Sequence, residues 1–194
     1  MITELTEEQR AQIDVYAEKF LKIATDTTPA NRQLGEEVMK AIYKYRELSE
    51  PVIYWADSPY AGLVKAAQLS NNTDTPTDEQ INEMKKYVFY ANFECHWKAF
   101  YAYLAEVLNV PNDNFYKLTI QLAENCGAYF ALDGAVVMCE KPVKVFYDPT
   151  IKGHHNPDGL AVEYKDGSGS YAYKGKKYNT LLDMEMAKQL EITE

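Results

Sequence analysis

Apolar residues recur at helical spacing through the first two thirds of the chain. Thr6 and Thr77 each begin a capping-box pattern, and Ser58 followed by Pro59 has the form of an N-cap with proline in the first turn. Gly127 is expected to end the last helix in the left-handed conformation. The pattern predicts amphipathic helices over residues 7–25, 30–48, 59–69, 77–108 and 114–125.

From Ala128 onward, apolar and polar positions alternate as they do in a β-strand. Asp-Gly and Lys-Gly pairs separate the short runs, and such pairs favour hairpin turns because glycine readily adopts a positive φ. The earlier run 52–55 is apolar throughout and predicts a buried strand, at an edge or in the centre of the same sheet. The strands predicted in the C-terminal part are 135–139, 143–147, 160–164 and 170–173.

Helical and strand patterns occupy different parts of the chain, which indicates an α+β fold. We expect amphipathic helices packed on one face of a C-terminal antiparallel β-meander, with a final C-terminal helix that Asn179 caps. A length of 194 residues, of which 46% are apolar, suits one folded domain and excludes disordered chains and disulfide scaffolds. The expected parts of this single domain 1–194 are a helical part (1–127), a β-hairpin part (128–178) and a terminal helix (179–192).

The net charge of −9 comes from 29 acidic and 20 basic residues. Residues 1–127 carry −7, residues 128–178 carry +1 and the last sixteen residues carry −3, so the acidity lies on the helical part. Nucleic-acid binders usually present a basic face, because contacts with phosphates supply much of their affinity. A nucleic-acid partner is therefore not expected, and Lys174, Lys176 and Lys177 form at most a small local patch.

The three cysteines, Cys95, Cys126 and Cys139, form no CxxC pair and lie near no cluster of histidines. We therefore expect no metal site, no cofactor and no disulfide. The first twelve residues contain no apolar core of the length that a signal peptide has, and no run approaches the ~18 apolar residues of a membrane span. The pattern is typical of a cytoplasmic protein without a membrane partner.

Several motifs give the chain a family resemblance. Trp55-Ala-Asp-Ser-Pro59 and Cys139-Glu-Lys-Pro142 are followed by the segment Asp148 to Ala161, which contains His-His-Asn-Pro-Asp-Gly, and by Tyr164-Lys-Asp-Gly167. Over most of residues 30–178 the chain resembles an uncharacterised family of bacterial and phage domains with W-x-x-S-P, L-H-N-x-D-G-P-A and Y-x-D-G motifs. It departs from that pattern at His154 and Leu160, where the family has leucine and proline. The resemblance implies a phage or mobile-element accessory factor in the host cytoplasm, and it transfers no activity.

The segment 153–159 is the densest cluster of polar groups in the chain. His155 could bind a ligand or act as an acid or base, with Asp148 and Asp158 orienting its imidazole. In the alternative interpretation, His155 and Asn156 bond to backbone groups around a structured turn.

The junction Trp55–Pro59 lies where a predicted strand leads into a helix. Free N–H groups at a helix start suit an anion, although Asp57 and Ser58 could simply cap the helix. Trp97 belongs to an aromatic segment, 87–103, which could form a ligand-stacking wall, a partner interface or part of the core. We expect the junction to meet the 153–159 loop in one site, with Trp97 on the third side and Tyr173 nearby.

No recognisable catalytic motif is present in the chain. The favoured hypothesis is a binding or interaction protein for a small polar ligand or a protein partner. The alternatives are a small enzyme that acts on a nucleotide-like or other polar metabolite with His155 as acid or base, and a structural protein that forms homo-oligomers through its tyrosine-rich surface.

Overall fold

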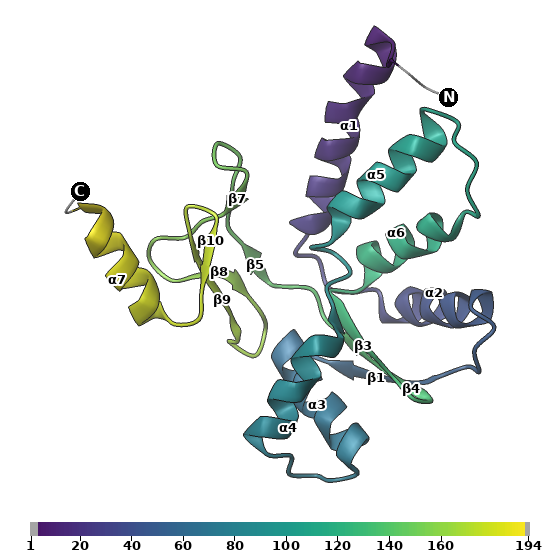
Figure 1. Ribbon diagram of the computed structural model, residues 1–194. Coiled ribbons are helices and arrows are strands. Elements are labelled where there is room, and N and C mark those ends of the chain that lie inside the picture. The colour runs from purple at the N-terminus through teal and green to yellow at the C-terminus, as the bar shows by residue number, and fades with distance from the viewer. Residues whose placement is uncertain (1–3, 193–194) are drawn as a thin grey trace.

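The computed structural model describes residues 4–192. Its helical part is built on a four-stranded sheet in the order β1-β4-β3-β2 (Figure 1). β1 runs parallel to β4, whereas the β4–β3 and β3–β2 pairs are antiparallel. The strands are β1 (Val52–Ala56), β2 (Val88–Phe89), β3 (Ala128–Leu132) and β4 (Ala135–Cys139).

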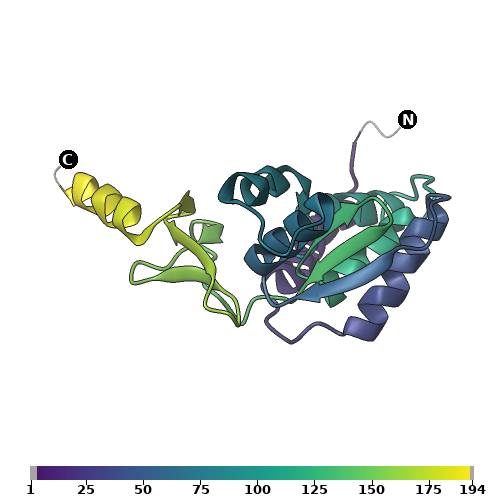
Figure 2. The same ribbon diagram turned by 90° about the horizontal axis from the view of Figure 1, so that it is seen from below.

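Helices cover both faces of this sheet (Figure 2). α3 (Pro59–Asn71) and α4 (Asp78–Glu83) pack on the face that carries Val137 and Cys139. α2 (Arg32–Tyr45) and α6 (Phe115–Asn125) pack on the opposite face, against Val136 and Met138. Because successive residues of β4 point to opposite faces, burial on both sides requires the continuous apolar run that the sequence shows here.

α1 (Glu7–Ala24) and α5 (Cys95–Glu106) add a further helical cluster against α6. Phe20, Cys95 and Ala123 lie at its centre. The predicted starts of three helices are confirmed. Thr6 and Thr77 form capping boxes, and the Ser58 Oγ accepts a hydrogen bond from the Ala61 N–H.

The helix predicted over residues 77–108 is wrong. The segment divides into α4, a 3₁₀ turn at Met84–Tyr87, the short strand β2, and α5. Val88 and Phe89 pair with Phe130 and Tyr129 at the edge of the sheet. Aromatic and β-branched residues pack well on a pleated surface, so the free edge of β3 overrides the helical spacing.

The left-handed cap predicted at Gly127 is also wrong. Positive φ values among the described glycines occur only at Gly134, Gly167 and Gly175. Gly127 donates its N–H to the Cys139 carbonyl, and a Cβ at this position would overlap the backbone carbonyl of Glu140. Glycine is needed here because two backbone segments approach closely.

The C-terminal part has its own antiparallel sheet, in the order β10-β9-β8-β5, beside the two-stranded β6–β7 hairpin. Lys174 and Gly175 both have positive φ and join β9 to β10, which confirms the hairpin predicted there. α7 (Leu181–Ile192) follows and contacts β9 and β10. The strands are β5 (Lys144–Val145), β6 (Tyr147–Asp148), β7 (Gly153–His154), β8 (Leu160–Glu163), β9 (Gly169–Tyr173) and β10 (Lys176–Tyr178).

The predicted α+β class is confirmed, including the C-terminal helix. The single meander predicted for the C-terminal part is wrong, however: β3 and β4 join β1 and β2 in one sheet, on which most helices pack, and only the strands after residue 139 form sheets of their own (Figure 1). Ser58 at the start of α3 donates to the Asp166 carboxylate at 2.5 Å and links the two parts. Phe93 and His154 add a ring contact, with their centroids 5.2 Å apart.

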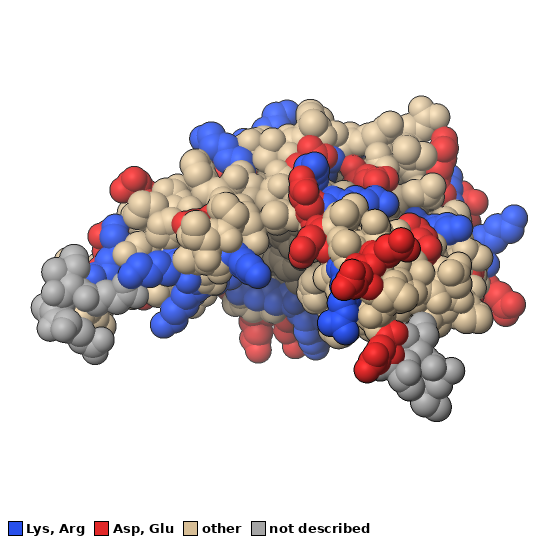
Figure 3. Space-filling model, turned by 90° about the horizontal axis from the view of Figure 1, so that it is seen from above, with Lys and Arg blue, Asp and Glu red and all other residues tan. Residues whose placement is uncertain are grey.

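Charge is distributed between the two parts as the sequence indicates. Figure 3 shows acidic side chains clustered over the helical part on the right, and lysine side chains over the C-terminal part on the left. The surface on this side is hollowed between the two parts. Within residues 4–192, no helix is both long and apolar enough to cross a membrane.

Candidate ligand-binding site

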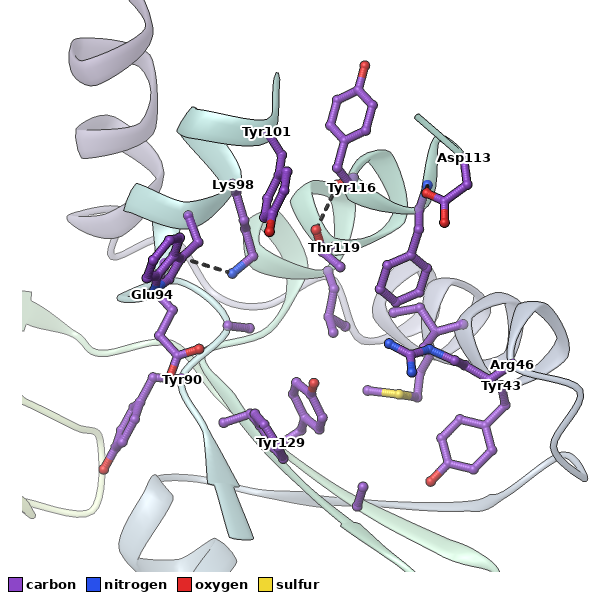
Figure 4. A pocket seen from close by; sticks show the side chains of 18 of the residues that line it. Tyr43, Arg46, Tyr90, Glu94, Lys98, Tyr101, Asp113, Tyr116, Thr119 and Tyr129 are labelled. Carbon is purple, nitrogen blue, oxygen red and sulfur yellow. Dashed lines mark hydrogen bonds between the residues drawn. The ribbon is translucent and has the colours of Figure 1, made fainter. Parts of the chain in front are cut away.

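A cavity of about 780 Å³ lies between α2, α5, α6 and the edge of the sheet formed by β2 and β3 (Figure 4). Its walls are largely aromatic and come from all four sides. The aromatic lining includes Tyr43, Tyr90, Trp97, Tyr101, Phe115 and Tyr129.

Each helix contributes a stripe of residues at helical spacing. α5 and its N-cap present Glu94, Trp97, Lys98 and Tyr101 to the cavity, at i, i+3, i+4 and i+7. The other face of α5 carries Cys95 and packs towards α1. In the same way, α2 contributes Met39, Ile42, Tyr43 and Arg46, and α6 contributes Phe115, Thr119 and Leu122.

Ring contacts hold several wall residues in place. The Phe89 ring stacks on that of Tyr129, with centroids 5.2 Å apart and planes 15° apart. Tyr45 stacks on Phe115 at 4.9 Å. The Trp97 ring lies tilted beside that of His96, with centroids 5.3 Å apart, and the residue is 59% exposed on the cavity wall. An exposed indole beside an aromatic cavity is well placed to stack on a planar ligand.

Four charged residues line the same cavity: Arg46, Glu94, Lys98 and Asp113. The Asp113 carboxylate accepts a hydrogen bond from the Tyr45 hydroxyl at 2.5 Å and another from the Phe115 N–H at 3.0 Å. These bonds, the Tyr45 bond foremost, lower the pKa of Asp113. Burial lowers the pKa of Lys98, because the ammonium form loses hydration.

The hydroxyls of Tyr43 and Tyr129 are neutral donors at physiological pH. Burial raises the pKa of Tyr129 to about 12, and it also raises the pKa of Tyr43. Each hydroxyl can therefore donate one hydrogen bond to a ligand while its ring provides an apolar wall. Apolar walls with a few polar groups are the usual composition of a small-molecule site.

Of the candidate residues named from the sequence, Trp97 alone lines this cavity. His155 lies in the C-terminal part, where its Nδ1 accepts the Lys174 N–H at 2.9 Å and its ring contacts Tyr173. The Asn156 side chain donates to the Leu160 carbonyl and accepts the Asp158 N–H. These are the backbone bonds of a structured turn.

The other candidates lie at the helix junction and in the β6–β7 hairpin. The Trp55 indole donates to Glu36 at 2.8 Å, and Asp57 lies 3.8 Å from the Arg32 guanidinium. Ser58 caps α3 and bonds to Asp166. Asp148 accepts two hydrogen bonds from Thr150, which lower its pKa.

The junction and the 153–159 loop contact different ends of β9. Ser58 contacts Asp166, which precedes β9, whereas His155 contacts Lys174, which follows β9. A strand rises ~3.3 Å per residue, so the five residues of β9 separate the two places by roughly 17 Å. The junction and the loop thus contact opposite ends of β9, and a site that they share stays a prediction.

Sequence reasoning missed most of the wall. Tyr43, Arg46, Phe115 and Tyr129 come from three elements that are far apart in the chain. Their spacing was visible, but a stripe that lines a cavity has the same period as a stripe that fills a core. The excess of aromatic residues in the segment 87–103 was the one usable signal.

A second hollow, of about 1040 Å³, lies between α1, α5 and the β6–β7 hairpin. It is lined mainly by apolar residues such as Ile13, Phe100 and Leu104. Its charged lining residues are Asp14 and Glu18 of α1 and Lys152 of the hairpin loop, and the rest of its wall offers few polar groups to orient a ligand. Within the described part of the chain, no group of three His, Cys, Asp or Glu residues is placed to hold a metal ion.

Comparisons with known proteins add no relative. No family model, curated protein or solved structure matches this chain. The resemblance drawn from the W-x-x-S-P and D-G motifs therefore stays a prediction, and the geometry of the cavity is the basis for a function.

Proposed function

We propose that this protein is a cytoplasmic binding protein, and that it holds a planar small molecule with polar substituents in the aromatic cavity. The observation that carries the proposal is a hollow of about 780 Å³ walled by aromatic rings from three helices and a sheet edge. Its volume falls within the ~300–1,000 Å³ typical of small-molecule sites. Rings that are held by their neighbours, such as Tyr129 under Phe89, favour stacking because little conformational freedom is lost on binding.

The test uses N-phenyl-1-naphthylamine, an uncharged aromatic probe whose fluorescence rises on leaving water. Thr119 lines the cavity from the middle of α6, so Thr119→Phe fills part of the space. Lys117 lies on the same helix, is exposed and does not line the cavity, so Lys117→Phe is the matched control. We expect Thr119→Phe to weaken probe binding by about tenfold or more, and Lys117→Phe to leave it unchanged.

Equal binding by the wild type and Thr119→Phe would contradict the proposal, because the probe would then occupy another surface. Melting curves of both variants serve as the folding control. Trp97 supplies an independent signal, since a ligand stacked at the opening should quench its emission. Trp55→Phe removes the other tryptophan, which lies outside the cavity lining.

A further inference from the structure

Lys98 stands in an unusual position on the cavity wall. Within residues 4–192, the only hydrogen bond of the Lys98 ammonium group is a long one, 3.4 Å from Nζ to the Glu94 carbonyl oxygen. No carboxylate of the described residues lies within 4.0 Å of this ammonium group. A half-buried cation without a counterion is costly, and the desolvation that lowers the pKa of Lys98 has the same origin.

Arg46 approaches the cavity from the opposite wall, at the end of α2. Its guanidinium carbon lies 4.8 Å from the centre of the Phe115 ring. Among the described residues, the guanidinium forms no hydrogen bond or ion pair with a carboxylate. Stacking on an aromatic face leaves the edge of the guanidinium, with its N–H donors, open to a ligand.

The two acidic residues of the lining act on these cations only from a distance. Burial lowers the pKa of Lys98 by more than the Glu94 charge raises it, and the Arg46 charge adds to the hydrogen bonds that lower the pKa of Asp113. Neither carboxylate forms an ion pair with Lys98 or Arg46. Asp113 already accepts hydrogen bonds from the Tyr45 hydroxyl and the Phe115 N–H. Glu94 is exposed, and Figure 4 shows its carboxylate beside Tyr90, away from the Lys98 amine. The figure also shows Lys98 and Arg46 extending into the cavity from opposite sides.

We infer that the ligand of this cavity is an aromatic anion, whose carboxylate, sulfonate or phosphate group binds between Lys98 and Arg46 while its ring stacks on the aromatic walls. The inference rests on the binding function proposed above and names its ligand class. An anion supplies the direct charge contact that neither cation has among the described residues, and charge-assisted hydrogen bonds from an ammonium and a guanidinium are strong in a partly desolvated site. The neutral tyrosine hydroxyls can donate to the same group.

The test compares two probes that differ by one anionic group. These are 8-anilinonaphthalene-1-sulfonate and the uncharged N-phenyl-1-naphthylamine. For each probe, the fluorescence that the wild type shows and Thr119→Phe does not is taken as binding to the cavity. Lys98→Met and Arg46→Met each keep the length of an apolar stem and remove the charge. We expect each to weaken binding of the sulfonate by about tenfold, and binding of the uncharged probe by less than about twofold.

Lys117→Met is the matched control, since it removes an exposed lysine outside the cavity and should change neither affinity. Lys98→Arg keeps the charge and should retain sulfonate binding. Melting curves of each variant report folding, because a partly folded chain exposes apolar surface that binds such probes. If Lys98→Met and Arg46→Met weaken both probes equally, or neither, the anion inference is overturned while the binding function stands. If Thr119→Phe removes neither probe, the binding function itself fails.

Discussion

The buried Lys141 ammonium provides the sharpest test of how the fold is held. Lys141 lies two residues after the end of β4, and its side chain is 2% exposed. Nζ donates to the Asp26 carboxylate at 2.5 Å, to the Glu124 carbonyl at 2.9 Å and to the Thr28 hydroxyl at 3.2 Å. The contacts join the segment between α1 and α2 to the end of α6. Asp26→Asn removes the only negative charge among these partners.

Breaking a buried ion pair from one side costs ~3–5 kcal/mol, because the remaining charge loses its counterion. The Asp26 side chain is 33% exposed, so water replaces part of the lost interaction. We therefore expect the low end, about 3 kcal/mol, which lowers the melting temperature of a chain of this size by roughly 6–12 °C. Lys141→Met removes the charge itself and should cost about 1 kcal/mol, since the apolar stem keeps its packing.

Urea unfolding followed by circular dichroism measures both values and that of the double variant. The double variant should match Lys141→Met, because the aspartate change is harmful only while the buried ammonium remains. The reasoning is refuted if Asp26→Asn costs less than about 1 kcal/mol, or if the two single costs simply add.

Three further expectations follow from individual contacts. Burial alone would raise the pKa of Asp26, but hydrogen bonds from Lys141 and Thr28 outweigh it and lower that pKa. The stabilisation of the fold by the Asp26 carboxylate should therefore be complete above the ordinary carboxyl pKa of ~3.9 and disappear as the pH falls through the lowered pKa of the folded state. Acid titration should then destabilise the wild type more steeply than Asp26→Asn. Gly127→Ala should cost about 2–3 kcal/mol in thermal unfolding, because its Cβ would overlap a backbone carbonyl that cannot easily move. Ser58→Ala removes both the cap of α3 and the bond to Asp166 and should cost about 1–2 kcal/mol, whereas Asp166→Asn, which leaves the cap, should cost less.

Local signals predicted many of the elements correctly. The caps at Thr6, Ser58 and Thr77 begin helices, and the Lys174-Gly175 turn has the backbone conformation that a tight hairpin needs. Each of these depends on a few neighbouring residues, and such interactions have the same geometry in any fold. The α+β class followed from where the helical and strand periods lie along the chain.

The candidate site was predicted less well, because its residues meet only through packing. The 153–159 loop has the composition of a functional site, but its His155 and Asn156 side chains are engaged with backbone groups. The cavity instead combines Arg46 and Lys98, which no local motif marks. Composition near one point of the chain therefore could not indicate the cavity on which the proposed function rests.

The sequence by itself determined the starts of α1, α3 and α4, the tight hairpin, the excess of negative charge on the helical part and the presence of a strongly aromatic segment. The start of α5 was missed, and α7 is capped by Thr180 rather than by the predicted Asn179. Tertiary structure decided that the segment 77–108 is not one continuous helix. Val88 and Phe89 pair as a short strand with the edge of β3, and this pairing interrupts the helix. Tertiary structure also decided that Gly127 is needed where its backbone lies close to that of Glu140, and not as a helix cap. Tertiary packing also decided that the residue stripes of α2, α5 and α6 surround a cavity instead of filling a core. Periodicity states which residues share a face of a helix, but the distance between facing helices depends on how the whole chain packs.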